Sequence, residues 1–201
     1  MERRAAMAEQ LINGQVIEAC QQGDRDAFQL LFETYKDRVF SIAVYSSGGD
    51  RTVAEDVTQQ IFLKLFTAIR QFRGDSEFTT WLYRLVVNAC LDERRRTRRF
   101  LPWEETRGTV AMRNPSDKKP QEWQYARLEV AEAVRKAIAE LKPKFRLPIL
   151  LKYIEGLSYD EIASVMGCSK GTVASRLNRG HSQLAKRLSH LNNQAVWGDQ
   201  L

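Results

Sequence analysis

A pair of short helices joined by a glycine turn constrains the fold of this chain more than any other feature. The segment spans Gly156 to Leu188 and reads GLSYDEIASVMGCSKGTVASRLNRGHSQLAKRL. Ser158 and Glu161 have the Ser-x-x-Glu spacing of a capping box, which starts a helix. Gly167 permits the left-handed turn that would end this helix, and Ser169 can cap the next one. The pattern predicts a helix–turn–helix.

The outer face of the second helix is predicted to bind DNA. Val173, Leu177 and Leu184 would be buried, which leaves a small, polar and basic face in solvent. Basic side chains hold phosphates, while Ser, Asn and Arg can reach base edges in a major groove. Residues 126–191 carry 12 Lys or Arg against 6 Asp or Glu. The alternative is a helical hairpin with an ordinary solvated face. The predicted DNA-binding residues are Ser169, Lys170, Thr172, Ala174, Ser175, Arg176, Asn178 and Arg179.

The rest of the chain also has helical periodicity, and no stretch alternates with a period of two for long. A segment beginning at Leu101 contains three prolines and no period, which is typical of a linker. The chain is therefore predicted to be all-α, with two small helical domains joined by a flexible linker and the helix–turn–helix in the C-terminal domain. The predicted boundaries are a tail at 1–14, a domain at 15–100, the linker at 101–124, a domain at 125–191 and a tail at 192–201.

The composition of the chain indicates which kinds of partner it can bind and which kinds of site it lacks. The chain has 31 Lys or Arg against 25 Asp or Glu, which suits an anionic partner such as nucleic acid or a membrane surface. Its first 15 residues lack the apolar core of a secretory signal, and no apolar run approaches the roughly 18 residues of a membrane span. Cys20, Cys90 and Cys168 form no CxxC pair, so neither zinc nor a disulfide framework is indicated. We expect a cytoplasmic protein without metal or other cofactor.

A block of arginines ends the last helix of the predicted N-terminal domain. The six residues Arg94 to Arg99 include five arginines, at the end of a helix that begins after Gly74. One or two cations offset the dipole of a helix C-terminus, but five exceed that need. Trp81, Tyr83 and Asn88 precede them on the same helix. Charge for phosphates, rings for stacking and an amide for a base edge favour a nucleic-acid surface, with a nonspecific basic patch as the alternative.

Four motifs in a fixed order extend these local patterns to nearly the whole chain: GDRDAFQLLFETY, AEDVTQQIFLKLF, FRGDSEFTTWLYRLVVNACLDERRR and EGLSYDEIASVMGCSKGTVASRL. Together they resemble the extracytoplasmic-function (ECF, group IV) sigma factors of bacterial RNA polymerase, from about Gln15 to Leu191. The resemblance implies that residues 15–100 are sigma domain 2, which binds the polymerase clamp and the minus-ten element. It implies that residues 125–191 are sigma domain 4, whose recognition helix binds the minus-thirty-five element.

The resemblance also assigns roles to residues. The beta-prime clamp of the polymerase would contact Asp56, Gln59, Gln60, Leu63 and Lys64, and family members often carry an acid at the position of Gln60. A base flipped from the minus-ten strand would be captured by Arg73, Gly74, Asp75, Ser76 and Asn88. The adjacent duplex backbone would be held by Arg94, Arg95, Arg96, Arg98 and Arg99. Implied partners are core RNA polymerase (beta-prime clamp and beta flap), promoter DNA and an anti-sigma factor, without direct membrane insertion.

Three functional hypotheses follow. The first is a sigma factor that recognises both promoter elements and has no catalytic activity; its 24-residue linker reaches about 80 Å when extended, enough for elements roughly 70 Å apart. The second is a stand-alone helix–turn–helix regulator. The third is a metal-dependent nuclease using Asp50, Glu55 and Asp56, which is disfavoured because acids in a first helical turn are explained by the helix dipole.

Overall fold

A computed structural model describes residues 12–100 and 122–189, with the side chains of 97–100 and 122–128 outside that description. Within these residues the chain is helical and contains no strand, which confirms the all-α prediction. Most of the predicted N-terminal tail, most of the predicted linker and all of the predicted C-terminal tail lie outside the described residues. The elements are α2 (Gly14–Gln22), α3 (Arg25–Ser46), α4 (Arg51–Ala68), the 3-10 helix η1 (Ile69–Gln71), α5 (Phe78–Phe100), α6 (Glu122–Ala139), α7 (Pro143–Tyr153), α8 (Tyr159–Met166) and α9 (Lys170–Arg187).

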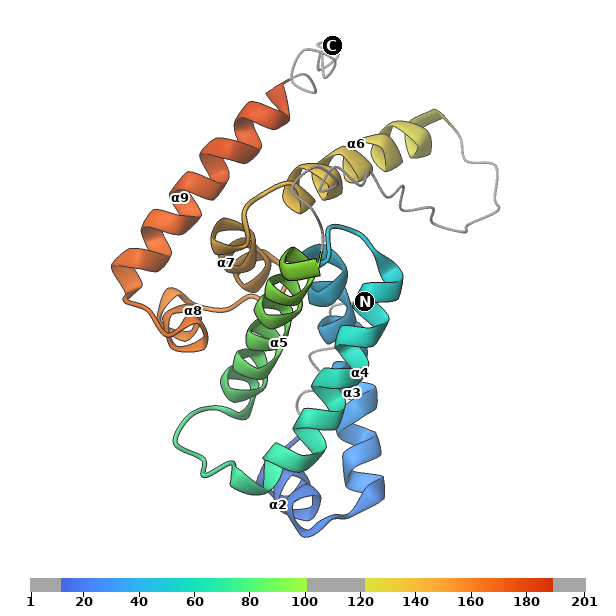
Figure 1. The fold of residues 1–201 in the computed structure, drawn as a ribbon, viewed down its shortest axis with the longest axis vertical. Helices are drawn as coiled ribbons and strands as arrows, with labels where there is room; N and C mark the ends of the chain where they lie inside the picture. Colours follow the sequence, from blue (N-terminus) through green and yellow to red (C-terminus); the bar gives the residue numbers. More distant parts are fainter. Residues whose placement is uncertain (1–11, 101–121, 190–201) are drawn as a thin grey trace, which may run out of the picture.

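Helices α2 to α5 form the N-terminal domain, and polar side chains start three of them. The side-chain oxygens of Asn13, Asp24 and Asp50 accept hydrogen bonds from backbone N–H groups in the first turns of α2, α3 and α4. The long helices α3, α4 and α5 pack together, with α2 across the end of the domain near η1 (Figure 1). An apolar stripe of α4 is buried at Val57, Ile61 and Leu65.

Helices α6 to α9 form the C-terminal domain around α7. Helix α7 begins at Pro143, although proline interrupts a helix at most other positions. Proline fits the first helical position because its missing N–H has no partner there in any helix. Seven consecutive residues of α7, 145–151, are buried. One face of α7 packs on α9, so the opposite face must find another cover.

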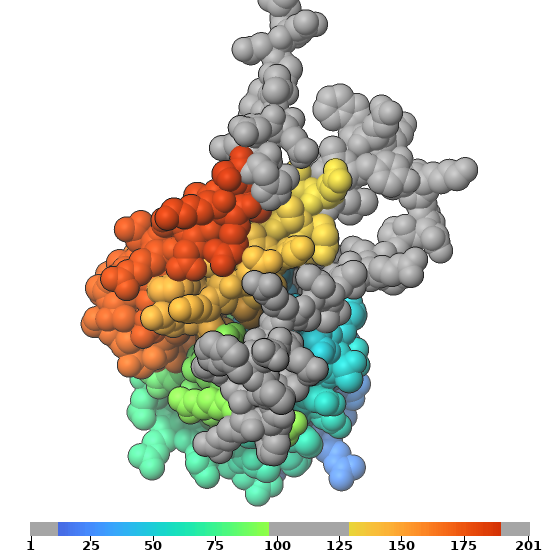
Figure 2. Space-filling model, turned by 45° about the horizontal axis from the view of Figure 1, so that its top comes forward, coloured from blue at the N-terminus to red at the C-terminus, as the bar shows by residue number. Residues whose placement is uncertain are grey.

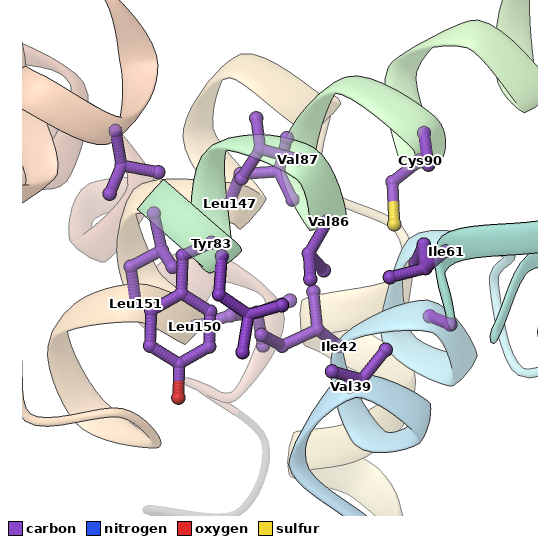
Figure 3. Close-up of a cluster of buried hydrophobic side chains, with 14 of the residues drawn as sticks. Val39, Ile42, Ile61, Tyr83, Val86, Val87, Cys90, Leu147, Leu150 and Leu151 are labelled. Atoms are coloured by element: carbon purple, nitrogen blue, oxygen red, sulfur yellow. The ribbon is translucent and has the colours of Figure 1, made fainter. Parts of the chain in front are cut away.

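That cover comes from the N-terminal domain, which the sequence did not predict: α3 packs beside α7, and α5 packs beside α8 and contributes side chains over α7. Figure 3 shows Tyr83 and Val87 of α5 facing Leu147, Leu150 and Leu151 of α7. On its other side α5 contributes to the N-terminal core, where Val86 lies beside Ile42 (Figure 3). The buried side chains of both domains form one continuous apolar cluster. In the space-filling view the orange α8 region lies directly against the green part of α5 (Figure 2).

The start of α8 gives a test of local stability. The predicted capping box is present: the Glu161 N–H donates to Ser158 Oγ at 3.2 Å, and the Ser158 N–H donates to the Glu161 carboxylate at 2.7 Å. These bonds hold the pKa of Glu161 below its usual value. Ser158→Ala should lower the free energy of unfolding by about 1 kcal/mol, measured by denaturant titration. Ser158→Asp, which keeps an acceptor, is the control; equal losses in both variants would contradict a capping role.

Candidate nucleic-acid interface

Helices α8 and α9 present an exposed helix face, as the helix–turn–helix prediction required. Gly167 ends α8 in the left-handed conformation, with φ 59°, and its N–H donates to the carbonyls of Ala163 and Ser164. Ser169 then caps α9, accepting from the Thr172 N–H at 3.2 Å. Gly180 of α9 is buried against α7, where an added methyl group would meet Ile149 Cδ1 at 2.6 Å. This close packing fixes which side of α9 faces outward.

The predicted DNA-binding residues of α9 divide by their surroundings. Ser169 and Thr172 are partly occupied in starting the helix, since their hydroxyls also lie 2.9 Å apart. Lys170 pairs with Asp160 of α8 at 2.7 Å, and Arg176 is half-buried with Nη1 3.7 Å from Cys168 Sγ. The remaining predicted residues are exposed: Ala174, Ser175, Asn178 and Arg179. The face therefore offers a hydroxyl, an amide and the exposed guanidinium of Arg179, beside Lys170 and the half-buried Arg176.

A second polar surface lies at the loop between η1 and α5. Gln21 of α2 fixes the start of this loop, donating from Nε2 to the carbonyls of Ile69 and Phe72 at 3.1 and 2.7 Å. Three aromatic rings, Phe72, Phe78 and Trp81, pack together with centroids 5.2–5.8 Å apart. The loop residues Arg73, Gly74 and Asp75 are exposed, Ser76 is half-buried, and Asn88 is exposed farther along α5. The rings thus anchor a loop whose polar groups face solvent.

The arginine block does not form one uniform surface. Arg95 and Arg96 are exposed and lie 3.4 Å from Asp92 and Glu93, respectively, one turn earlier. Arg94 is half-buried and lines a cavity of about 10 Å³ at the domain boundary, together with Cys90 and Arg146. Burial raises the pKa of the Cys90 thiol to about 11. Arg98 and Arg99 belong to α5, but their side chains lie outside the described residues.

The predicted polymerase-binding residues lie together on the outer side of α4. All are exposed: Asp56, Gln59, Gln60, Leu63 and Lys64. Leu63 is 62% exposed, which is high for a large apolar side chain. It borders a groove of about 610 Å³ between α3 and α4, lined mainly by Phe28, Phe32, Phe62 and Phe66. An exposed apolar groove with a polar rim is typical of a protein-binding site.

Comparisons with known proteins give the family. Residues 31–100 match the sequence profile of sigma-70 region 2, and residues 131–184 match that of sigma-70 region 4. The chain is 34% identical over 186 residues to the RNA polymerase sigma-H factor of Pseudomonas aeruginosa, covering 90% of this chain and 96% of that protein. It is 34% identical over 197 residues to the ECF RNA polymerase sigma-E factor of Escherichia coli, covering 92% and 98%. The chain belongs to the extracytoplasmic-function sigma factors.

Solved structures agree with this assignment. CnrH, in complex with the cytosolic domain of CnrY, is similar with a TM-score of 0.63 and 26% identity, over 87% of this chain and 96% of CnrH. The sigma factor RpoE of Bartonella quintana, in complex with the anti-sigma factor NepR, has a TM-score of 0.65 and 22% identity, over 81% and 96%, and supports the fold. This sigma factor therefore has the helical fold that its sequence motifs imply.

The described residues were also compared with what a metal site, a nuclease site or a membrane span would need. Among the residues that the structure describes, no group of three or more His, Cys, Asp or Glu side chains could hold a metal ion. Asp50, one of the acids in the nuclease hypothesis, caps α4 by accepting from the Val53 N–H at 3.1 Å. None of the described helices is long and apolar enough to cross a membrane.

The residues that join the two domains of the sigma factor were not predicted from its sequence. Arg84, Arg146 and Glu155 make polar contacts between the domains, and none of them was predicted to have a role. The sequence does contain one indication of these contacts, at Arg146. Arg146 interrupts an otherwise apolar run from 145 to 151, and a charge in such a run must be paired when the run is buried.

Proposed function

We propose that this sigma factor uses three separate surfaces during initiation. The outer side of α4 and its groove bind the beta-prime clamp of core RNA polymerase. The loop at 73–76 and Asn88 capture a base from the minus-ten strand, with Arg94, Arg95, Arg96, Arg98 and Arg99 along the adjacent duplex. The exposed face of α9, from Ser169 to Arg179, binds the minus-thirty-five element. The chain acts in the cytoplasm and has no catalytic activity of its own.

The observation that carries this proposal is the exposure of all three surfaces. Buried Val173 and Leu177 turn the polar side of α9 outward, and packed aromatic rings hold the loop before α5 in place. A stand-alone regulator would need the face of α9 but not the apolar groove beside Leu63. The groove therefore favours a chain that works on a large protein partner. An anti-sigma factor is a further expected partner, since the similar RpoE structure contains one.

The polymerase surface can be tested by reconstitution with core enzyme. Leu63→Glu places a charge beside the apolar groove, so it should reduce polymerase binding and single-round transcription at least tenfold while leaving the fold intact, because Leu63 is exposed. Leu30→Glu is the matched control, since Leu30 is exposed on α3 and does not line the groove. Equal polymerase binding by both variants would contradict a role for the groove, and specific duplex binding without any polymerase binding would favour the stand-alone regulator.

The base-capture surface should act during DNA opening. Asn88→Ala removes an exposed amide that could hydrogen-bond an extruded base, so promoter opening should fall more than closed-complex formation. Permanganate reactivity measures the first and footprinting the second. Gln29→Ala removes an exposed amide from α3 and should change neither. Equal loss of opening and closed binding in Asn88→Ala would remove this residue from base capture.

The face of α9 should show the salt dependence of a phosphate contact. Arg179→Ala removes an exposed cation, so binding to the minus-thirty-five duplex should weaken and the slope of log K against log salt should fall by about 0.9. Arg187→Ala is matched in charge, but Arg187 lies at the end of α9 and its Nε is 3.2 Å from Glu140. A slope that changes equally in both variants would mean that net charge, and not this face, determines binding.

A further inference from the structure

The candidate base-capture loop, residues 73–76, begins where a short 3-10 helix ends. Helix η1 covers Ile69–Gln71, and the chain becomes extended at Phe72. The Phe72 N–H donates to the Ile69 carbonyl at 3.1 Å, which closes the last turn. The carbonyl of Phe72 lies beyond this turn, and carbonyls at the end of a helix have no partner within the helix. A side chain or water must therefore satisfy it.

Gln21 of α2 provides that partner. Its Nε2 donates to the Phe72 carbonyl at 2.7 Å and to the Ile69 carbonyl at 3.1 Å. A primary amide nitrogen carries two hydrogens, so both are used, and the two carbonyl acceptors determine which side of the amide faces η1. The acceptors are 48 and 51 residues from Gln21 in the sequence. One half-buried side chain therefore ties α2 to the start of the loop.

Helix α2 gives this amide a fixed position in the domain. The side chain of Asn13 caps its start, and Gly23 ends it in the left-handed conformation, with φ 90°. Cys20, the neighbour of Gln21, is buried in the apolar core. Arg70 of η1 lies over the turn at Gly23, since a Cβ added to Gly23 would be 3.7 Å from Arg70 Nη2. Helix α2 therefore meets η1 both at this turn and through the amide of Gln21.

The bond from Gln21 also orients the first peptide group of the loop. A peptide group is planar and trans, so its C=O and N–H point in opposite directions. Because the Phe72 carbonyl is directed at Gln21, the N–H of Arg73 is directed away from it. Gly74 follows in the left-handed conformation, with φ 76°, and the side chains of Arg73 and Asp75 are exposed. The direction of the exposed loop is therefore set at its first peptide group.

Aromatic packing holds the two ends of the loop together but does not set this direction. The ring of Phe72 packs on those of Phe78 and Trp81, with centroids 5.6 and 5.2 Å apart. Hydrophobic contacts have little direction, so the rings can keep the ends close while the Phe72 carbonyl turns. Hydrogen bonds weaken steeply when they are misaligned. The amide of Gln21 therefore supplies the directional restraint that the rings lack.

We propose that Gln21 is a positioning residue for base capture, which holds the loop at 73–76 in the direction that an extruded base requires. This inference rests on the proposed function of that loop. Gln21 acts through the Phe72 carbonyl and need not contact DNA. A loop that is held in place beforehand does not have to be ordered when the base enters, so less free energy is lost on capture. The role belongs to promoter opening, because the proposed polymerase and minus-thirty-five surfaces lie on α4 and α9.

Gln21→Met tests the role, since methionine has a similar length and no donor. Removing two neutral hydrogen bonds that act on base capture should reduce promoter opening about tenfold. Permanganate reactivity with core polymerase measures this step. Polymerase binding and closed-complex formation, the latter measured by footprinting, should change much less. Gln21→Lys retains donors for the carbonyls and should restore most of the opening.

Gln22→Met is the matched control, because Gln22 is the next residue of α2 and is exposed. It should open the promoter as the wild type does. Equal opening by Gln21→Met and Gln22→Met would overturn the proposal. Equal losses of polymerase binding, closed binding and opening in Gln21→Met would also overturn it, because general destabilisation lowers every step. A defect in Gln21→Lys as large as that in Gln21→Met would show that the donors do not matter, with the same consequence.

The hydrogen bonds themselves can be measured in the free, full-length protein. By NMR, the side-chain amide hydrogens of Gln21 should exchange with solvent more slowly than those of exposed Gln22. The reason is that a bonded N–H exchanges only when the bond opens. Equal exchange rates would overturn the proposal even if Gln21→Met failed to fold.

A series of promoters with each minus-ten base changed in turn separates this role from the proposed function. The wild type should lose opening when the captured base is changed, and Gln21→Met should lose most of that base preference. A wild type without any base preference would overturn base capture and, with it, the role of Gln21. A preference that Gln21→Met keeps in full would overturn the role of Gln21 alone.

Discussion

The burial of α5 on two sides is the constraint on which the rest of this structure depends. Val86 faces α3 in the N-terminal core, while Tyr83 and Val87 face α7 of the C-terminal domain. A single helix therefore contributes to the hydrophobic core of both domains. Its remaining exposed strip carries Asn88 and Arg95, so α5 is also part of the candidate DNA surface. Any movement of the C-terminal domain must change the environment of this helix.

Charged groups give that packing its specificity. Apolar surfaces such as those of Leu147 and Leu150 can slide and repack, because dispersion and hydrophobic burial have little direction. The guanidinium of Arg146 cannot, since its donors must meet the carbonyl ends of α3 and α6. Burial lowers the pKa of Arg146 to about 10, yet this leaves it charged at neutral pH. A buried cation that needs one set of acceptors selects one relative position of the domains.

Local features of this fold could be predicted from the sequence, because neighbouring residues determine them. The capping box at Ser158 and the turn at Gly167 are both present as predicted. The packing of the domains could not be predicted. The apolar run of α7 shows that two faces of this helix must be covered, but it does not show that α3 and α5 of the other domain provide the cover. Likewise, nothing local to Arg146 indicates that its acceptors lie about a hundred residues earlier, at Tyr45.

In the candidate site too, features set by neighbouring residues could be predicted from the sequence, whereas contacts between helices could not. Exposure of Asn178 and Arg179 follows from the helical period, whereas the pairing of Lys170 with Asp160 depends on the angle between α8 and α9. The face of α9 offers exposed Arg179 and Lys170, the latter in a surface ion pair with Asp160, and such a small positive surface should bind DNA weakly by itself. Two weak modules on one linker bind tightly only when both are engaged, because the second contact is then intramolecular. Tight promoter binding should therefore need both DNA-facing surfaces at once, and losing either one should cost more than its own contacts.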